Sequence, residues 1–137
     1  SSLYAAHPDG TKVCVANVPT PSLSFSAVRS GKLEEYHRMS VSPVGLQNGR
    51  LTQKHTTAFS GICADNRHVY VLYSGNRTLD GKLPSDECCN LIVYDWDGNP
   101  VKRYALDQRV HSIHVVGNRV YGATTYPESR VYMFLLD

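Results

Sequence analysis

Short apolar runs with polar residues at alternate positions recur along the chain, each preceded by turn-forming residues. Residues 65–72 begin with Asp-Asn-Arg and continue as His-Val-Tyr-Val-Leu, and residues 116–123 repeat this plan 51 residues later. A third version occupies residues 9–16, 56 residues before the first. Asp or Asn beside Gly between apolar runs is a strong hairpin signal. Because another short apolar run precedes each turn (3–7, 57–63 and 111–115), the pattern predicts three β-hairpins.

A second pattern follows each hairpin. Residues 91–104 read as strand, Asp-Gly turn and strand, and residues 23–36 follow the same plan. Residues 131–137 copy the first half of it. The segment 32–39, rich in Lys, Glu and Arg, is also compatible with a short helix, but its alignment with 101–106 favours a strand.

Together these patterns predict an all-β fold of four-stranded meanders at the spacing of β-propeller blades. We expect one partial domain over 1–137, with blades at about 3–39, 57–106 and 110–137 that contain four, four and three strands. Closed propellers have about four to eight blades. We therefore expect half of a longer propeller, or a half that pairs with another copy of itself.

Composition agrees with this interpretation and narrows the function. The 137 residues include 15 Val and nine Tyr against one Trp and two Met, which favours strands. A net charge of +2 is too balanced for a nucleic-acid-binding protein, and no apolar run is long enough to span a membrane. Residues 1–4 do not resemble a signal peptide, which fits a mature or trimmed product and does not place the chain in the cytoplasm.

Three strings carry a family resemblance: Val-Tyr-Val-Leu-Tyr-Ser-Gly at 69–75, Leu-Ile-Val-Tyr-Asp-Trp-Asp-Gly-Asn-Pro-Val at 91–101, and Val-Tyr-Gly-Ala at 120–123. They resemble the TolB-like six-bladed propeller proteins of Bacteroides and relatives, and Pro-Asp-Gly-Thr-Lys at 8–12 is similar to the hairpin of an earlier blade. The resemblance implies the C-terminal half of a six-bladed fold. It also implies an exported protein of the bacterial periplasm or outer membrane, with any lipid anchor on a missing N-terminal part. It transfers no catalytic residue.

Several polar residues fall on the predicted innermost strands. Aligning these strands places His7, Cys63 and His114 at equivalent positions near the channel, and the small residues Ala5, Gly61 and Ser112 at another. Adjacent sheets pack about 10 Å apart, whereas zinc bonds are about 2 Å long, so one metal cannot take ligands from all three blades. We expect interior polar residues, with no metal and no cofactor.

The other cysteines and one turn have plainer explanations. Cys14, like Cys63, lies in an apolar strand pattern and is expected to be a buried small hydrophobe. Cys88 and Cys89 form either a strained disulfide or two thiols at the mouth of a strand. The sequence Asp-Trp-Asp-Gly-Asn at 95–99 resembles the opening of a calcium loop but lacks its distal Glu, so we expect a hairpin turn.

The longest predicted loop, Ser74–Asn90, is the strongest binding candidate. Loops longer than about 12–15 residues are often functional. Its mixed charges suit a polar ligand or a protein partner, although a tolerated surface insertion explains it equally well. The candidate binding residues are Arg77, Asp80, Lys82, Asp86 and Glu87, together with Asn76.

Motifs for catalysis are missing from the sequence, which has no nucleophile elbow, no zinc-protease motif and no phosphate-binding loop. Ser60 and His55 are close in sequence, which is weak evidence for a site, and His111 and Glu128 would form a site only if other blades completed it. We expect a non-catalytic module that binds a protein or glycan, with self-association as a further possibility. The alternatives are half of a propeller enzyme, a lyase or hydrolase, and a purely structural repeat. A paired-carboxylate or His/Tyr cluster near the channel would favour the enzyme, and loops rimmed by exposed aromatics such as Tyr73 or Tyr126 without such a cluster would favour binding.

Overall fold

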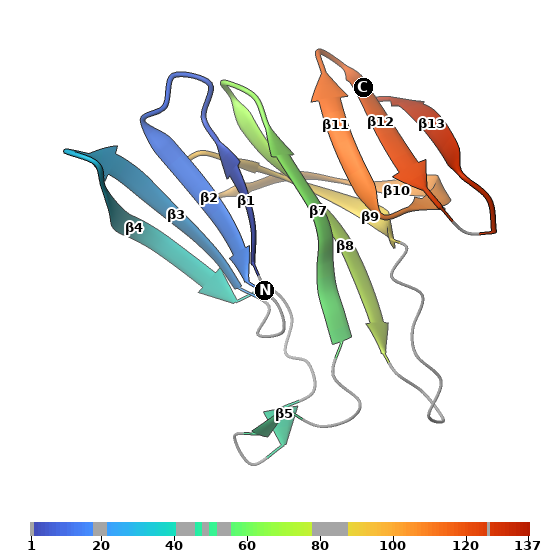
Figure 1. The fold of residues 1–137 in the computed structure, drawn as a ribbon, viewed down its shortest axis with the longest axis horizontal. Helices are drawn as coiled ribbons and strands as arrows, with labels where there is room; N and C mark the ends of the chain where they lie inside the picture. The colour runs from blue at the N-terminus through green and yellow to red at the C-terminus, as the bar shows by residue number, and fades with distance from the viewer. Residues whose placement is uncertain are drawn as a thin grey trace.

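The computed structural model describes residues 2–17, 22–40, 46–47, 50–51, 56–77, 88–125 and 127–137; within these ranges, the side chains of 46–47, 50–51, 56–58, 74–77 and 88–89 are outside the description. The described segments form three antiparallel sheets, each a meander in chain order (Figure 1). The first sheet contains β1 (Ser2–Ala6), β2 (Lys12–Asn17), β3 (Ser22–Arg29) and β4 (Lys32–Ser40); the second contains β7 (Thr56–Ala64), β8 (His68–Arg77), β9 (Cys88–Asp95) and β10 (Pro100–Val110); the third contains β11 (Ser112–Val116), β12 (Arg119–Thr124) and β13 (Arg130–Leu135).

This arrangement confirms the all-β fold and the division into four, four and three strands. The segment after Gly31 is strand β4 and not a helix. Two details differ from expectation. A small hairpin, β5 (Leu46–Gln47) with β6 (Arg50–Leu51), lies between the first two sheets in sequence, and the expected loop from Ser74 to Asn90 is shorter because β8 continues to Arg77 and β9 begins at Cys88. No helix that could cross a membrane is found among the described residues.

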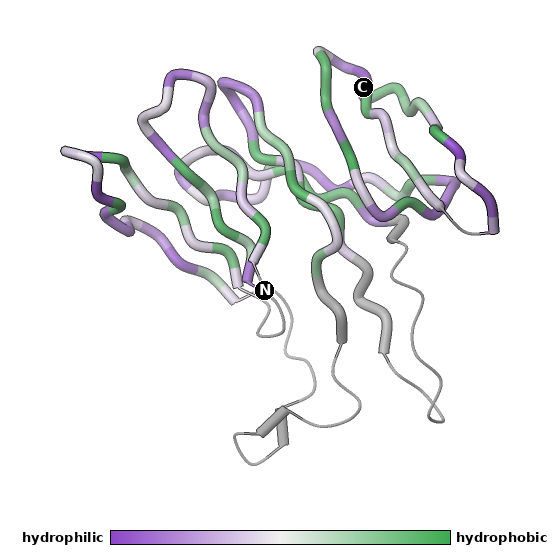
Figure 2. Tube along the Cα trace, viewed as in Figure 1, coloured by the Kyte–Doolittle hydropathy of each residue, from purple (hydrophilic) through white to green (hydrophobic). Residues whose placement is uncertain are grey.

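The sheets pack face to face and bury two separate cores. We call the packing between the first and second sheets the first junction, and that between the second and third sheets the second junction. The first core contains Leu23 and Phe25 of the first sheet, opposite Val69 and Val71 of the second. The second core contains, among others, Leu72 and Leu91 of the second sheet and Val120 of the third. Apolar residues follow the strands at both junctions, whereas the outer strand β4 is largely hydrophilic (Figure 2).

Alternation along each strand gives every sheet two faces with different partners. The face that contains Phe25 in the first sheet, and Val93 in the second, packs on the sheet that follows; we call it the front face. The opposite, or back, face contains Tyr94 in the second sheet and Phe134 in the third, and it packs on the sheet before. Because the register is the same in all three sheets, equivalent positions can be compared across the two junctions.

The register corrects one sequence-based alignment. Cys63 pairs with Tyr70 and His114 with Tyr121, so these two residues are equivalent as predicted. In the first sheet, however, Ala5 pairs with Cys14 at that position. The β1–β2 turn is two residues longer than the other two turns. The alignment by residue spacing therefore displaced His7 and Ala5 by two residues along the strand, onto the same face of the sheet. His7 ends its strand at the position that Asp65 occupies in the second sheet, since each donates its backbone N–H to the residue that closes the turn.

Candidate functional site

The first junction is closed at its turn end by the indole of Trp96. This residue lies in the turn between β9 and β10 and is buried. Its ring is perpendicular to the ring of Phe25, with centroids 6.5 Å apart, and its centre lies 5.2 Å from that of the His7 ring. Its indole N–H donates to the backbone oxygen of Asp65 at 3.0 Å. The indole is thus held by both sheets.

Two residues of β4 complete this closure. Tyr36 occupies a β-bulge, and its hydroxyl donates to the backbone oxygen of Trp96. Burial, followed by the nearby charge of Asp97, raises the pKa of Tyr36, so the hydroxyl remains a donor. His37 packs against Gly98, whose φ of +90° and lack of a side chain let the turn approach the ring. Only glycine fits here without displacing His37.

The turn that presents Trp96 is stabilised by its own carboxylate. Asp95 accepts hydrogen bonds from the backbone N–H groups of Asp97 at 3.0 Å and Asn99 at 2.9 Å, and from the Asn99 side chain at 3.1 Å. Burial alone would raise the pKa of Asp95, but these hydrogen bonds outweigh it and hold the pKa below its usual range. The carboxylate therefore serves the hairpin turn that the sequence predicted.

The same positions carry different residues in the second junction. Leu136 stands at the position of Trp96, Val93 at that of Phe25, and Asp65 at that of His7. Strand β10 has a bulge equivalent to that of β4, with Val101 in place of Tyr36 and Lys102 in place of His37. Smaller or more polar side chains therefore replace a set that is mostly aromatic, and the turn end of the second junction is left open.

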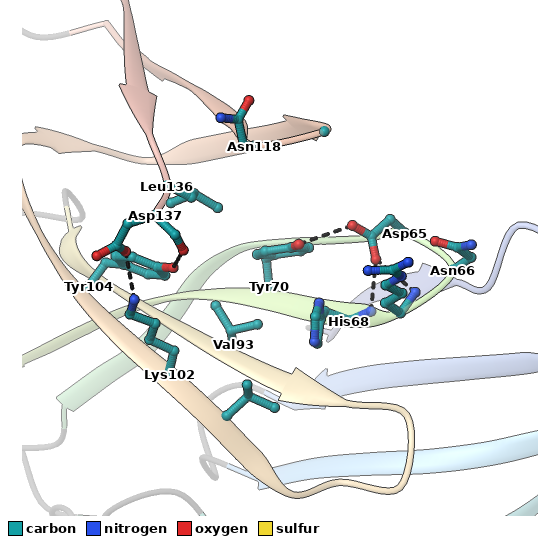
Figure 3. A pocket seen from close by; sticks show the side chains of 13 residues that line it. Asp65, Asn66, His68, Tyr70, Val93, Lys102, Tyr104, Asn118, Leu136 and Asp137 are labelled. Carbon is teal, nitrogen blue, oxygen red and sulfur yellow. Dashed lines mark hydrogen bonds and ion pairs between the residues drawn. The ribbon is translucent and has the colours of Figure 1, made fainter.

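A pocket of about 610 Å³ occupies this opening. It extends from the β7–β8 turn, over Tyr70 and Val93, to β10 and the C-terminal residues (Figure 3). The side chains of Asp65, Asn66 and His68 lie at one end, and those of Lys102, Tyr104 and Asp137 at the other (Figure 3); Arg67 also lines the pocket. Volumes of about 300–1,000 Å³ are typical of sites for small molecules. We call this cavity the inter-blade pocket; Asn118 and Leu136 also line it.

At one end of the inter-blade pocket the carboxylate of Asp65 is fixed by three donors. One oxygen accepts the backbone N–H groups of Arg67 at 2.9 Å and His68 at 2.8 Å, and the other accepts the Tyr70 hydroxyl at 3.0 Å. Burial of Asp65 would raise its pKa, but these hydrogen bonds outweigh it and leave the pKa below its ordinary value. Asp65 is therefore ionised at neutral pH, while burial and the Asp65 hydrogen bond raise the pKa of Tyr70.

At the other end, Lys102 forms an ion pair of 2.6 Å with Asp137 and lies 4.9 Å from the centre of the Tyr104 ring. The Tyr104 hydroxyl donates to the backbone oxygen of Asp137 at 3.3 Å. The hydrogen bond to Asp137 raises the pKa of Lys102, and the same bond lowers that of Asp137. Arg67 differs from Lys102, because within the described part of the chain its guanidinium has no carboxylate partner.

These protonation states suit binding better than acid–base catalysis. The pocket does bring His68 within 6.1 Å of Tyr70 between ring centres, but this pair lies between two blades and is not the cluster near the channel that would favour an enzyme. Tyr70 also has a raised pKa and already donates to Asp65, so it is a poor base at neutral pH. A glycosidase needs a carboxylic acid with a raised pKa, whereas the pKa values of Asp65 and Asp137 are lowered.

The residues singled out from the sequence mostly lie elsewhere. Arg77 ends β8 and pairs with Thr56, but its side chain is outside the described residues, as are Asp80, Lys82, Asp86 and Glu87. The structure does not bring His7, Cys63 and His114 together as one site: His7 bonds the backbone oxygen of Asn66 at 3.1 Å, Cys63 is half-buried and His114 is exposed. No group of three metal-binding side chains occurs in the described ranges.

The remaining candidates have structural environments of their own. Cys14 is fully buried as predicted, and burial raises the pKa values of Cys14 and Cys63 to about 12. The side chains of Cys88 and Cys89 lie outside the described residues, and so do His55 and Tyr126. Glu128 pairs with Arg130, and His111 lies at the bend between β10 and β11. Tyr73 is half-buried against Phe59 and is not an exposed rim aromatic.

Three stacked antiparallel sheets, in which β7 contacts β1 on one side and β11 on the other, define a fragment of a β-propeller. A family model described as TolB-like 6-blade propeller-like matches residues 24–118, and the chain belongs to this family. No curated protein matches the sequence. The match includes most of β3 and all of β4 in the first sheet, the whole second sheet and β11 of the third sheet, and it ends before β12.

Proposed function

We propose that the chain is a non-catalytic binding module whose inter-blade pocket holds a glycan. One observation carries the proposal: the set that closes the first junction is replaced in the second by residues that leave a pocket lined with hydrogen-bonding groups. A pocket of this size fits a few sugar rings, whereas stable protein interfaces bury about 800 Å² per partner on flatter surfaces. Sugars present hydroxyls that carboxylate, amide and guanidinium groups bind, and C–H faces that pack on aromatic rings such as Tyr104.

The family resemblance supports a place for this activity in the bacterial envelope, where glycans are abundant. The residues of the chain segment 78–87 remain candidates for a separate contact, since β8 begins with His68 at the pocket and ends with Arg77 at the opposite end of the strand. A protein partner is the alternative ligand class. Half of a lyase or hydrolase is the alternative activity.

Glycan-array screening of the chain, followed by calorimetry with the best oligosaccharide, tests the proposal. We expect Arg67→Ala and Tyr104→Ala each to weaken binding by at least about tenfold, the equivalent of one lost charge-assisted hydrogen bond or ring contact. Arg29→Ala is the matched control, because Arg29 is an exposed arginine on the first sheet, paired with Glu34. Binding that all three variants retain, or no binding to any glycan, would refute the assignment, and product formation would show an enzyme.

A further inference from the structure

The acidic and basic side chains that line the inter-blade pocket differ in whether the protein already engages them. Lys102 and Asp137 form an ion pair of 2.6 Å. Both oxygens of the Asp65 carboxylate accept hydrogen bonds, from its own turn and from Tyr70. The guanidinium of Arg67 has no such partner: within the described ranges it forms neither an ion pair nor a side-chain hydrogen bond. Its five N–H donors are therefore available to a ligand.

The β7–β8 turn that carries Arg67 is held in place from more than one side. The backbone N–H of Arg67 donates to the Asp65 carboxylate at 2.9 Å. The Trp96 indole donates to the backbone oxygen of Asp65 at 3.0 Å, and the His7 ring bonds the backbone oxygen of Asn66 at 3.1 Å. The residues that close the first junction thus also fix the turn that borders the pocket. A ligand that pairs with Arg67 has to order one side chain and not a whole loop, which keeps the entropic cost of binding low.

The chemistry of these groups favours a ligand with one negative charge at this end of the pocket. A guanidinium presents two parallel N–H groups that match the two oxygens of a carboxylate, and these charge-assisted hydrogen bonds are among the stronger ones in proteins. A phosphate dianion fits less well, because its second charge would lie near the ionised Asp65 while Lys102 is already paired. A cationic ligand would need a carboxylate, and those of Asp65 and Asp137 are occupied.

We propose that the ligand of the inter-blade pocket is an acidic glycan that contains hexuronic acid, with one sugar carboxylate paired with Arg67. This inference rests on the function proposed above and adds the charge and the chemical group that the pocket selects. The amides of Asn66 and Asn118, which also line the pocket, supply donors and acceptors for the ring hydroxyls (Figure 3). Tyr104 offers its ring to a C–H face of the sugar.

Calorimetry with hexuronate oligomers, each beside its carboxyl-reduced counterpart, tests the proposal with the intact chain. The panel contains oligomers of glucuronate, galacturonate and mannuronate. Reduction converts each carboxylate to an alcohol and leaves the rings and linkages unchanged, so the two forms differ in that group alone. We expect at least one acidic oligomer to bind at least about tenfold more tightly than its reduced form. This preference should shrink as salt is added, because Arg67 is exposed and its ion pair is screened.

Arg67→Gln shows whether this side chain makes the selection. We expect it to weaken binding of the acidic oligomer at least about tenfold and to change binding of the reduced form less than about threefold, because glutamine still bonds hydroxyl groups. Arg103→Gln is the matched control. Arg103 lies in β10 of the same sheet, bonds Asn90 at 3.1 Å and does not line the pocket, so this variant loses the same net charge elsewhere. It should keep the full preference for the acid.

The outcomes separate this inference from the proposed function. A reduced oligomer that binds as tightly as its acid would overturn the inference and leave a glycan-binding module in place. Tighter binding of a sulfated or an amino-sugar oligomer than of every hexuronate would overturn it in the same way. An acid preference that Arg67→Gln leaves intact, or that Arg103→Gln removes equally, would contradict the pairing with Arg67. Binding to no glycan, neutral or charged, would refute both proposals.

Discussion

The two junctions of this propeller fragment share one architecture and differ in how their turn ends are filled. In the first, Trp96, Tyr36 and His37 close the space between the sheets, while in the second Leu136, Val101 and Lys102 leave a pocket. Backbone register and even the bulge are the same at both. The difference shows that a repeated fold can assign packing to one copy of a position and binding to another, because a few side chains decide which it is.

The largest expected effect comes from removing the indole that closes the first junction. Trp96→Ala deletes a buried ring and leaves the backbone oxygen of Asp65 without its donor. We expect a loss of about 3–5 kcal/mol in the free energy of unfolding, measured by urea denaturation followed by circular dichroism. Leu136→Ala at the equivalent position should cost about 2 kcal/mol or less, because that residue is only half-buried beside an open pocket. Equal losses would break the comparison.

A second test asks whether the second junction is loose throughout or only at its turn end. Gly122 lies opposite Val110, and a Cβ added at Gly122 would come within 2.8 Å of a Val110 methyl group. We expect Gly122→Ala to cost about 1–3 kcal/mol, since the site has no room for a methyl group. The double variant with Val110→Ala should show a favourable coupling.

Gly61→Ala is the control for this test. Its added Cβ would have its nearest neighbours at 3.4 Å, close to ordinary van der Waals contact, so a smaller loss is expected. If Gly122→Ala lowered the free energy of unfolding as little as Gly61→Ala, the second junction would be loosely packed at both ends. The inter-blade pocket would then result from poor packing of the whole junction and would not be a localised site.

The sequence predicted the sheets well because their signals are local. Alternation, Asp-Gly turns and the spacing of about 50 residues were enough to place β2, β3, β8, β9 and β12, and to choose a strand for Lys32–Ser40. Register across sheets was less accessible. Spacing alone aligned His7 with Cys63, because the extra length of the β1–β2 turn can only be located once strand pairing is known.

The inter-blade pocket was missed for a related reason. Its walls come from the β7–β8 turn, from β10 and from the C-terminal residues, which are distant in sequence. The copy of 91–97 in 131–137 did contain the signal, because it aligns Trp96 with Leu136 and Asp97 with Asp137. The loss of an aromatic residue at a repeated packing position marks a possible opening, but only the paired bulges of β4 and β10 show that Val101 and Lys102 face it.

Acid sensitivity offers a third test, centred on Asp65 at the pocket. Its folded-state pKa lies below the ordinary value of 3.8, so the stability it contributes is present above that value. That contribution is lost as the pH falls through the folded-state pKa. We expect Asp65→Asn to flatten the acid limb of a plot of unfolding free energy against pH and to cost about 1 kcal/mol at neutral pH through weaker hydrogen bonds.

Asp9→Asn provides the comparison at the β1–β2 turn. Asp9 also has a lowered pKa, with hydrogen bonds from Thr11 as the main cause, but it is exposed and lies away from the pocket. If Asp65→Asn left the acid limb unchanged, the three hydrogen bonds to the carboxylate would not stabilise the folded state as its geometry implies.

The smallest expected change in stability comes from rebuilding the first junction inside the second. Leu136→Trp places an indole at the open turn end, and Val101→Tyr supplies a hydroxyl at the bulge, as Tyr36 does for Trp96. We expect the single variant to gain less than about 1 kcal/mol, because Val93 offers a smaller surface than Phe25, and the double variant to gain more than the sum of the singles. Filled in this way, the pocket should no longer bind the glycan. Since the scaffold is unchanged and Arg67 and Tyr104 are retained, loss of binding with a gain in stability would show that the open space itself is the functional difference between the two junctions.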